Sequence, residues 1–365
     1  MKRVGVGIIG CGNISPAYLK AAEGFPILKI VGLADANPDA AKARATEFGL
    51  KARSIEALLD DPAVEIILNL TIPKAHVEVG LTAIAAGKHV HSEKPLGVTV
   101  AEARKLMRAA EANHVRVGCA PDTFLGGAHQ TARKLIDEGA IGRPIGGTAF
   151  FMCPGHESWH PNPGFYYLAG GGPMLDMGPY YITDLVNLLG PVARVSGTAT
   201  RLRNERVITS EPLAGTRIPV EVATHVTGTL AFVSGAVVTV TMSFDVPKHG
   251  HAPIEIYGEK ASLKVPDPNY FGGEIEFAEP RGEWREIPTE HGYADGNYRI
   301  IGVADMAHAI RSGRPHRASG ALAFHVLEVM EAFQRSSDSG AVVSIDSRPE
   351  RPAALPVGLK EGALD

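Results

Sequence analysis

Residues 4–15 read VGVGIIGCGNIS, and this segment gives the clearest indication of the fold class. Its first half, Val4–Ile9, is an apolar run rich in β-branched side chains, which is typical of a buried strand. Its second half matches the pattern GxGxxG except at the last position, where Ser15 replaces the third glycine. Pro16 then suits the first turn of a helix. A strand, a glycine turn and a helix in this order predict the first unit of a parallel sheet.

The alternation of strands and helices continues to about residue 120. Apolar runs predict strands at 29–34, 64–70, 89–91 and 115–119, with a weaker one at 51–53, and helical spacing marks 16–23, 38–48, 55–60, 75–86 and 101–113. Thr99 followed by Glu102 is a capping box for the last of these helices. We therefore predict an α/β fold in which residues 1–122 form a Rossmann domain, with helices on both faces of its sheet.

The pattern changes after residue 122. One helix at 127–138 is followed by β-like runs at 146–152, 192–202, 221–232, 236–245, 253–257, 262–265 and 274–278, with further helices at 174–189, 302–311 and 321–335. Short turns between consecutive strands predict a large, mostly antiparallel open sheet. We expect residues 123–348 to form an α+β domain for substrate binding and oligomerisation, whose closing helices can pack on the first domain, and residues 349–365 to form a tail.

Composition excludes several classes of function. The 365 residues carry a formal net charge of −4, so no net positive field is available for nucleic acid. No apolar run reaches the length of a membrane span, and nothing before Val4 suits a signal peptide. The three cysteines, Cys11, Cys119 and Cys153, lack disulfide or metal-site spacing. We expect a reduced, cytoplasmic protein without a metal site, and the Thr- and Val-rich strands at 224–244 predict a homodimer or homotetramer formed through the second sheet.

The glycine turn predicts a dinucleotide site. Gly10 permits the tight turn, Gly12 lets the backbone approach a pyrophosphate, and the helix N-terminus supplies N–H groups. Asp35 lies 23 residues beyond Gly12 at the end of the second strand, where a carboxylate accepts ribose hydroxyls and repels a 2′-phosphate. The alternatives are a plain glycine turn and an Asp35 that only caps the next helix. Because no arginine stands at 35–38, we predict NAD rather than NADP.

The triplet Glu93-Lys94-Pro95 directly follows a predicted strand. It therefore lies at the edge formed by the carboxyl ends of the strands, where open parallel sheets bind ligands. Desolvation beside a cationic nicotinamide would lower the pKa of Lys94, so that it can hold or deprotonate a substrate hydroxyl. The alternative is an ordinary surface lysine paired with Glu93.

Four segments together resemble the family named for glucose-fructose oxidoreductase, inositol dehydrogenase and MocA. They are GIIGCGNIS, the stretch NLTIP at 69–73 followed by His76, the EKP triplet, and GGGPMLDMG at 170–178. The resemblance runs along nearly the whole chain. It implies an N-terminal dinucleotide-binding domain and a C-terminal α+β domain with a large sheet used in subunit contacts. It also implies that Lys94 is the catalytic lysine and that Asp176 is the aspartate of the motif DxGxH.

The chain departs from that motif at Tyr180, which stands where the family has histidine. Family members that act on aldose sugars or dihydrodiols often carry tyrosine at this position. The resemblance therefore implies that this chain is functionally less similar to inositol dehydrogenases and anhydrofructose reductases. A tyrosine can carry the proton if a neighbouring ammonium, here Lys94, stabilises its phenolate. Asp176, four residues earlier on the predicted helix 174–189, would share its face and orient the substrate. Alternatively Tyr180 is a core aromatic, and Tyr181 is a rival for its role.

Residues 153–162, CPGHESWHPN, are rich in side chains that bind polyols. Trp159 offers an apolar face to a sugar, and His156 and His160 exchange hydrogen bonds with hydroxyls. We predict a substrate loop, with a structured surface loop as the alternative, and regard Asp122 as a weaker pocket candidate. No third ligand suggests a metal site at the two histidines.

These patterns predict an NAD-dependent oxidoreductase that moves hydride between nicotinamide and a sugar, polyol or related cyclic polyhydroxy substrate. The alternatives are an NAD-dependent enzyme that cleaves glycosides through transient oxidation, and a non-catalytic sugar or nucleotide sensor. The expected catalytic residues are Lys94, Asp176 and Tyr180. The expected cofactor contacts are Gly10, Gly12, Asn13, Ile14, Asp35, Thr71, Pro73, His76, Glu93 and Lys94. The expected substrate contacts are Lys94, Asp122, His156, Trp159, His160, Asp176 and Tyr180.

Overall fold

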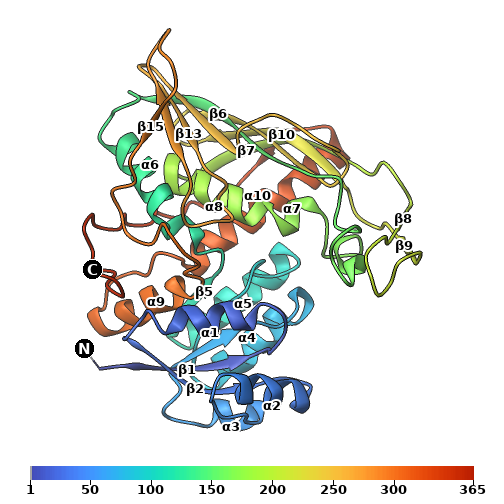
Figure 1. The fold of residues 1–365 in the computed structure, drawn as a ribbon, viewed down its shortest axis with the longest axis vertical. Coiled ribbons are helices and arrows are strands. Elements are labelled where there is room, and N and C mark those ends of the chain that lie inside the picture. Colours follow the sequence, from blue (N-terminus) through green and yellow to red (C-terminus); the bar gives the residue numbers. More distant parts are fainter. Residues whose placement is uncertain (1) are drawn as a thin grey trace.

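The computed structural model describes residues 2–365, which form two large sheets, one in each half of the chain, and one small hairpin (Figure 1). The first sheet is parallel and has the order β2-β1-β3-β4-β5. Its strands are β1 (Val4–Ile9), β2 (Leu28–Ala34), β3 (Ile66–Asn69), β4 (His89–Ser92) and β5 (Val117–Cys119). All six residues of β1 are buried, as expected of a central strand covered on both faces. The predicted Rossmann fold of the first half is confirmed.

Helices flank this sheet (Figure 1). They are α1 (Ser15–Ala22), α2 (Pro38–Glu47), α3 (Ile55–Leu59), α4 (His76–Ala85) and α5 (Val100–Ala112). The Thr99 hydroxyl accepts a hydrogen bond of 3.2 Å from the Glu102 amide, which confirms the predicted capping at the start of α5. The weak run at 51–53 contributes only a single bridge, between Leu33 and Ala52, because it does not run beside β2 for any length.

The second half contains a nine-stranded sheet of order β15-β14-β13-β12-β6-β11-β10-β7-β16. Its strands are β6 (Pro144–Met152), β7 (Val192–Thr200), β10 (His225–Phe232), β11 (Val237–Ser243), β12 (Ile254–Gly258), β13 (Ser262–Val265), β14 (Ile275–Ala278), β15 (Arg285–Ile287) and β16 (Val343–Ser344). Every neighbouring pair is antiparallel except β6 and β11. The predicted mostly antiparallel sheet is confirmed, and a separate small hairpin, β8 (Glu205–Val207) and β9 (Arg217–Pro219), was not expected.

Helices lie on one face of the large sheet, between it and the Rossmann half (Figure 1). They include α6 (Gly127–Asp137), α7 (Pro173–Asp176), α8 (Gly178–Leu189) and α10 (Gly320–Ser339), and α10 contacts β7 and α8 as well as α5 and β5 of the first half. The expected single helix 174–189 is instead two helices that meet at Met177. Pro179 has no N–H to donate to the carbonyl four residues earlier, so the helix restarts. On the opposite face Thr229 and Thr239 are exposed, and pairing of that face with a second subunit stays a prediction.

The last seventeen residues contain no helix or strand, yet they pack on the protein instead of forming a free tail. The Arg133 guanidinium donates to the Pro352 carbonyl at 2.5 Å, and the Leu355 amide donates to the Gln130 side chain at 2.8 Å. The Tyr293 hydroxyl donates to the Ala363 carbonyl at 2.6 Å. Residues 349–365 therefore form a strap that α6 and the loop preceding α9 (Ile301–Ser312) hold in place. Within residues 2–365, no helix combines the length and apolar character needed to span a bilayer.

Candidate active site

The glycine turn between β1 and α1 forms a cradle that suits a pyrophosphate. Gly10 has φ +106°, and a Cβ there would lie 2.5 Å from the Leu70 carbonyl, so only glycine fits. Gly12 is exposed, and a Cβ there would meet no heavy atom within 4 Å. No side chain caps the N-terminus of α1, so its first N–H groups are open to an anion. Beside this turn, Asn13 is exposed and Ile14 is half-buried.

The Ser15 hydroxyl donates to the Gly12 carbonyl at 2.8 Å, so the residue that replaces the third glycine closes the turn. Asp35 supports the same turn from β2. One carboxylate oxygen accepts the Cys11 amide at 2.7 Å and the other accepts the Asn37 amide at 2.8 Å. The cap of α2 is Asn37, whose side chain accepts the Asp39 amide at 3.1 Å, so Asp35 is not the helix cap. Each Asp35 oxygen keeps a further lone pair for a ribose hydroxyl.

The turn after β3 is held by a histidine that was expected to touch the cofactor. His76 is completely buried, and its two ring nitrogens lie 2.7 Å from the Pro95 carbonyl and 2.9 Å from the Thr71 carbonyl. His76 therefore joins two loops from behind and is not itself exposed to a ligand, which corrects that expectation. Thr71 and Pro73 are half-buried at the mouth of this turn, and Ile72 between them is exposed.

Lys94 does not pair with Glu93. The Glu93 carboxylate accepts the Tyr18 hydroxyl at 2.6 Å and the Lys94 backbone amide at 2.9 Å. The Lys94 ammonium instead donates to Asp176 of α7, at 2.8 Å to Oδ1 and 2.7 Å to the carbonyl oxygen. Its side chain is only 17% exposed, so it is no ordinary surface lysine. The structure thus brings together Lys94 of the Rossmann half and Asp176 of the second half.

This pairing shifts both groups toward their charged forms. Burial alone would lower the pKa of Lys94, but the Asp176 carboxylate, together with Tyr180 and Glu93, more than offsets it and raises the pKa above its ordinary value. Burial would raise the pKa of Asp176, yet the Lys94 ammonium and His156 lower it to about 2. The lowered pKa expected for Lys94 is therefore not what the protein's own contacts produce. They favour a hydrogen-bond-donating ammonium over a free amine.

Tyr180 lies in the first turn of α8, with the Lys94 nitrogen 5.3 Å from the centre of its ring. Asp176 ends α7, so the two residues do not share one continuous helix face as expected, although both adjoin Lys94. Burial raises the pKa of Tyr180, and the Lys94 ammonium lowers it by less, so the phenol keeps its proton. The rival Tyr181 turns its hydroxyl toward Asp267, 3.5 Å away.

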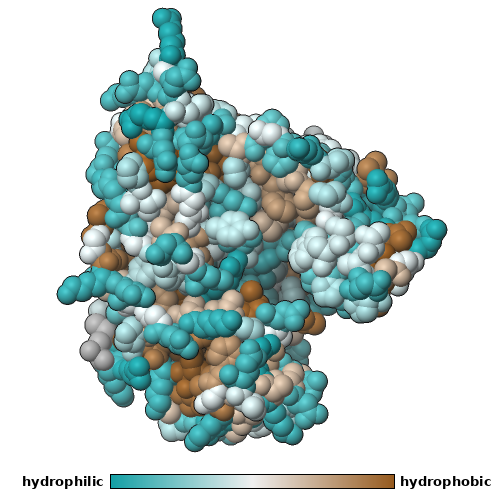
Figure 2. All heavy atoms as spheres, in the orientation of Figure 1, coloured by the Kyte–Doolittle hydropathy of each residue, from teal (hydrophilic) through white to brown (hydrophobic). Residues whose placement is uncertain are grey.

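The loop 153–162 reaches the same place from the end of β6. Nε2 of His156 lies 3.5 Å from Oδ2 of Asp176, the carboxylate oxygen that Lys94 does not use. Trp159 is 60% exposed beside it, and His160 is partly exposed. Figure 2 shows the surface hollowed between the Rossmann half and the lobe that carries β8 and β9. Lys94, Asp176, Tyr180 and His156 thus form one cluster, with Trp159 at its edge.

Asp122 is not part of this cluster. Its carboxylate accepts the Ile300 amide at 3.1 Å and the Gly302 amide at 2.9 Å, so it caps the N-terminus of α9. It is 1% exposed, and burial raises its pKa to about 6. The expectation that Asp122 contacts substrate is therefore corrected to a structural role.

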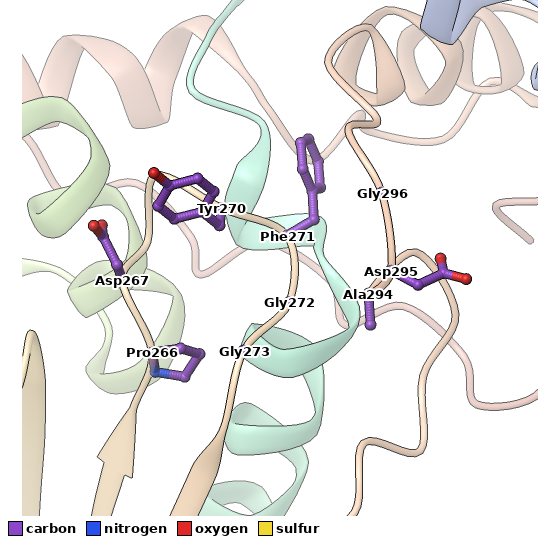
Figure 3. Close-up of a pocket in the computed structure, with 9 residues that line it drawn as sticks. All are labelled: Pro266, Asp267, Tyr270, Phe271, Gly272, Gly273, Ala294, Asp295 and Gly296. Atoms are coloured by element: carbon purple, nitrogen blue, oxygen red, sulfur yellow. The ribbon is translucent and has the colours of Figure 1, made fainter.

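Two cavities lie outside the cluster. The first, of about 500 Å³, lies between the loop 266–273 and residues 294–296 (Figure 3). The second, of about 560 Å³, lies between Val98, the turn Gly170–Gly172 and α10. Neither is lined by Lys94 or Asp176. In the part of the chain from residue 2 onward, no group of three or more His, Cys, Asp or Glu side chains is placed to hold a metal ion.

Sequence reasoning missed several residues that shape the site. Tyr18 positions Glu93, Arg299 lies against the Tyr180 hydroxyl and lowers its pKa, and Arg206 anchors the loop 153–162. Each acts across a long separation in sequence, and no spacing rule connects it to its partner. The glycine turn, the EKP triplet and the DxG segment were found because their residues are local to one turn.

Two family models match the chain and together cover more than half of it. One, described as an oxidoreductase family with an NAD-binding Rossmann fold, matches residues 4–120. The other, described as the GFO/IDH/MocA C-terminal domain, matches residues 129–264. The boundary between the two matches, at residues 120–129, lies between β5 of the first sheet and β6 of the second.

Similar proteins include named dehydrogenases and reductases. Inositol 2-dehydrogenase of Pseudomonas fluorescens is 26% identical, over 95% of this chain and 98% of that protein. The 1,5-anhydro-D-fructose reductase of Ensifer adhaerens is 34% identical, but over only 47% of this chain and 52% of that protein. The solved structure of levoglucosan dehydrogenase in complex with NADH and L-sorbose superposes with a TM-score of 0.82 and is 25% identical, over 95% of this chain and all of that one. The whole-length fold is therefore shared with an NADH-binding dehydrogenase.

Proposed function

The chain belongs to the Gfo/Idh/MocA family of oxidoreductases, and on that premise we propose that it transfers hydride at a secondary alcohol of a sugar or related cyclic polyhydroxy compound bound at Lys94, Asp176 and Tyr180. It is an NAD-binding oxidoreductase of the sugar or polyol dehydrogenase type. The observation that carries the proposal is the contact of Lys94 with Asp176. It joins one charged side chain from each half of the molecule in a partly open cluster.

NAD suits the cradle on physical grounds. Gly10 and Gly12, with Asn13 and Ile14, leave backbone open to a pyrophosphate, and Asp35, which binds the same turn, would face the ribose of a bound cofactor. Thr71, Pro73, Glu93 and Lys94 follow the ends of the next two strands, where the nicotinamide end of the cofactor would lie. When bound, the cofactor supplies the hydride acceptor or donor.

The chain's own residues would then hold the alcohol and stabilise its developing charge. In the direction of reduction, the Lys94 ammonium would donate a hydrogen bond to the carbonyl oxygen, and this bond strengthens as the oxygen gains negative charge. The ammonium would then give that oxygen its proton as hydride reaches the carbon, and in the direction of oxidation the neutral Lys94 amine would take the hydroxyl proton back as hydride leaves. Asp176 fixes the direction of the ammonium, and the buried Tyr180 phenol offers a second donor from α8. Trp159 presents an exposed apolar face to the C–H surface of a sugar ring.

An absorbance screen tests the proposal. The protein is mixed with NAD⁺ and a panel of aldoses, inositols, levoglucosan and other anhydrosugars, and NADH formation is followed. We expect one structural class to be oxidised clearly faster than the rest. Release of phenol from an aryl glycoside without accumulation of NADH would instead identify a glycoside-cleaving enzyme. Absence of NADH formation across the panel, with NADH binding intact, would contradict the proposal and favour a sensor.

Asp35→Ser is expected to weaken NADH binding about tenfold, because charge-assisted hydrogen bonds to the ribose are lost. NADPH binding should weaken less or improve, since the carboxylate no longer repels a 2′-phosphate. Fluorescence titration with both cofactors measures the change. Asp39→Ser in the first turn of α2, where the aspartate pairs only with Lys42 on the surface, is the matched control. Equal weakening by the two variants would remove Asp35 from the cofactor site.

A further inference from the structure

The turn just before α9 places a guanidinium beside the phenol of Tyr180. Arg299 belongs to this turn, and its side chain lies against the Tyr180 hydroxyl. Nη2 of Arg299 donates to Asn269, at 2.9 Å to Oδ1 and at 3.3 Å to the carbonyl oxygen. Both acceptors are neutral, so these hydrogen bonds orient the guanidinium without cancelling its charge.

The backbone that carries Arg299 is strained. The next residue, Ile300, has φ +111°, a conformation that a β-branched residue rarely adopts. The buried Asp122 carboxylate holds this turn, because it accepts the amides of Ile300 at 3.1 Å and Gly302 at 2.9 Å. Strained residues persist where the surrounding structure enforces them, and they are common at functional sites. The fold therefore tolerates strain at the point that directs Arg299 toward Tyr180.

The chemistry of the guanidinium limits what the Tyr180 hydroxyl can do. Arginine has N–H donors and no acceptor, whereas a phenol hydroxyl both donates and accepts. The Tyr180 oxygen can therefore only accept from Arg299, and its hydrogen must point elsewhere. This hydroxyl makes no hydrogen bond of ordinary geometry within residues 2–365, yet it is not among the atoms that are buried without a partner. It therefore retains exposed surface through which it can donate to a ligand.

On the basis of the proposed function, we infer that Arg299 is a positioning residue that makes Tyr180 a hydrogen-bond donor to the reacting oxygen of the substrate. Arg299 donates to the phenol oxygen, and the phenol donates to the substrate. Hydrogen bonds in a chain polarise one another, so the phenol is a stronger donor with Arg299 than without it. Lys94 from the Rossmann half and Tyr180 from the second half then bind the same substrate oxygen.

The charges around Tyr180 support this role. Burial raises the pKa of Tyr180 most, and the Glu93 carboxylate adds to the rise. Two cations, Lys94 over the ring and Arg299 at the hydroxyl, lower it. The neighbouring Tyr166 stays neutral, because burial raises its pKa to about 12. Removing Arg299 should therefore raise the pKa of Tyr180 further and leave a protonated but weaker donor.

A double-mutant cycle separates positioning from a purely structural role. With NAD⁺ and the best substrate of the panel, Arg299→Met should lower kcat about tenfold or more and change KM less than about threefold, since the lost bond acts mainly in the transition state. In the Tyr180→Phe background the same substitution should change kcat less than about twofold, because the group through which Arg299 acts is gone. Arg299→Lys keeps a charge and a donor and should recover part of the activity. Arg285→Met, which removes an exposed arginine 4.7 Å from the ring centre of Phe277, is the matched control and should leave kcat unchanged.

A spectroscopic measurement tests the inference without turnover. Tyr180 is replaced with 3-fluorotyrosine, whose more acidic phenol titrates at lower pH, and the ¹⁹F resonance follows the loss of its proton. In Arg299→Met the midpoint should lie at a pH higher by about one, because a cation that favours the phenolate is gone. Arg299→Gln, which loses the charge but keeps N–H groups, should show a shift in the same direction and replaces Arg299→Met if that variant does not fold.

Equal midpoints with and without Arg299, or equal losses of kcat from Arg299→Met in the wild-type and Tyr180→Phe backgrounds, would overturn the inference and leave the dehydrogenase proposal standing. If no alcohol or sugar is oxidised, the proposed function fails, and the ¹⁹F resonance alone decides. A higher midpoint in Arg299→Met then supports the control of Tyr180 by Arg299, and an unchanged midpoint overturns it.

Discussion

Lys94→Met is expected to reduce turnover by at least about 10³-fold while leaving NADH affinity within about twofold. The loss is large because one ammonium both binds the alcohol oxygen and offsets the charge that develops on it, and removing a single such donor already costs 10²–10³ in other active sites. The Lys94 ammonium binds Asp176 of the second half and makes no hydrogen bond to the glycine turn within residues 2–365. Steady-state kinetics with the best substrate of the panel and fluorescence titration with NADH measure the two effects separately.

Removing Lys94 also leaves the Asp176 carboxylate buried without its cation, which by itself destabilises a protein. The double variant Lys94→Met/Asp176→Asn removes that charge, so its melting temperature should recover toward wild type while turnover stays lost. Lys264→Met is the matched control, because Lys264 pairs with Glu276 at 2.9 Å and is similarly half-buried, but lies in β13. Turnover of Lys94→Met within tenfold of wild type would remove the lysine from the reaction.

The fold of the first half could be predicted closely because its signals are local. Val4–Ile9 has the predicted bounds, and the Thr99 cap lies where the sequence placed it. The second half was predicted less completely. Strands β8, β9, β15 and β16 are two or three residues long, too short for any alternation of apolar and polar residues to emerge. From the sequence, residues 349–365 were predicted to be a tail. The hydrogen bonds that hold this strap join its backbone to distant side chains such as Arg133, and no local pattern in the sequence indicates them.

The candidate site, like the second half of the fold, could be predicted from the sequence only in part. Lys94 and Asp176 were each expected at the site from a motif, but their shared hydrogen bonds, and the rise in the pKa of Lys94 that follows, depend on how the two halves meet. His76 and Asp122 are polar residues of the kinds that often bind ligands, yet the hydrogen-bond partners of their side chains are backbone groups of neighbouring loops. A sequence shows which side chains are polar, but whether a polar group is already satisfied is decided only by the packed structure.

Arg206→Met is expected to lower the free energy of unfolding by about 3–5 kcal/mol, since it breaks a buried ion-pair network. The Arg206 side chain is only 2% exposed. Its guanidinium donates to two carbonyl oxygens, those of Pro154 at 2.9 Å and Phe244 at 2.7 Å. It also donates to two carboxylates, those of Glu157 at 2.7 Å and Asp245. Its loss leaves two nearly buried carboxylates unpaired. Thermal and urea unfolding measure the effect, with an expected fall in melting temperature of about 4–7 °C for a chain of this length.

The matched control is Arg217→Met, because Arg217 pairs with Glu205 on the same hairpin but is exposed. Its removal should cost less than about 1 kcal/mol. Adding Glu157→Gln and Asp245→Asn to Arg206→Met should restore part of the stability, since the unpaired charges are then gone. Because Arg206 also anchors the loop that carries His156, its loss should weaken substrate binding at temperatures where the fold is intact, seen as a higher KM. Equal destabilisation by the two arginine variants would show that burial of the network adds nothing, and the loop would then be held by its aromatic contacts and its other hydrogen bonds, such as those from the Thr209 and Ser210 amides to the Glu157 carbonyl.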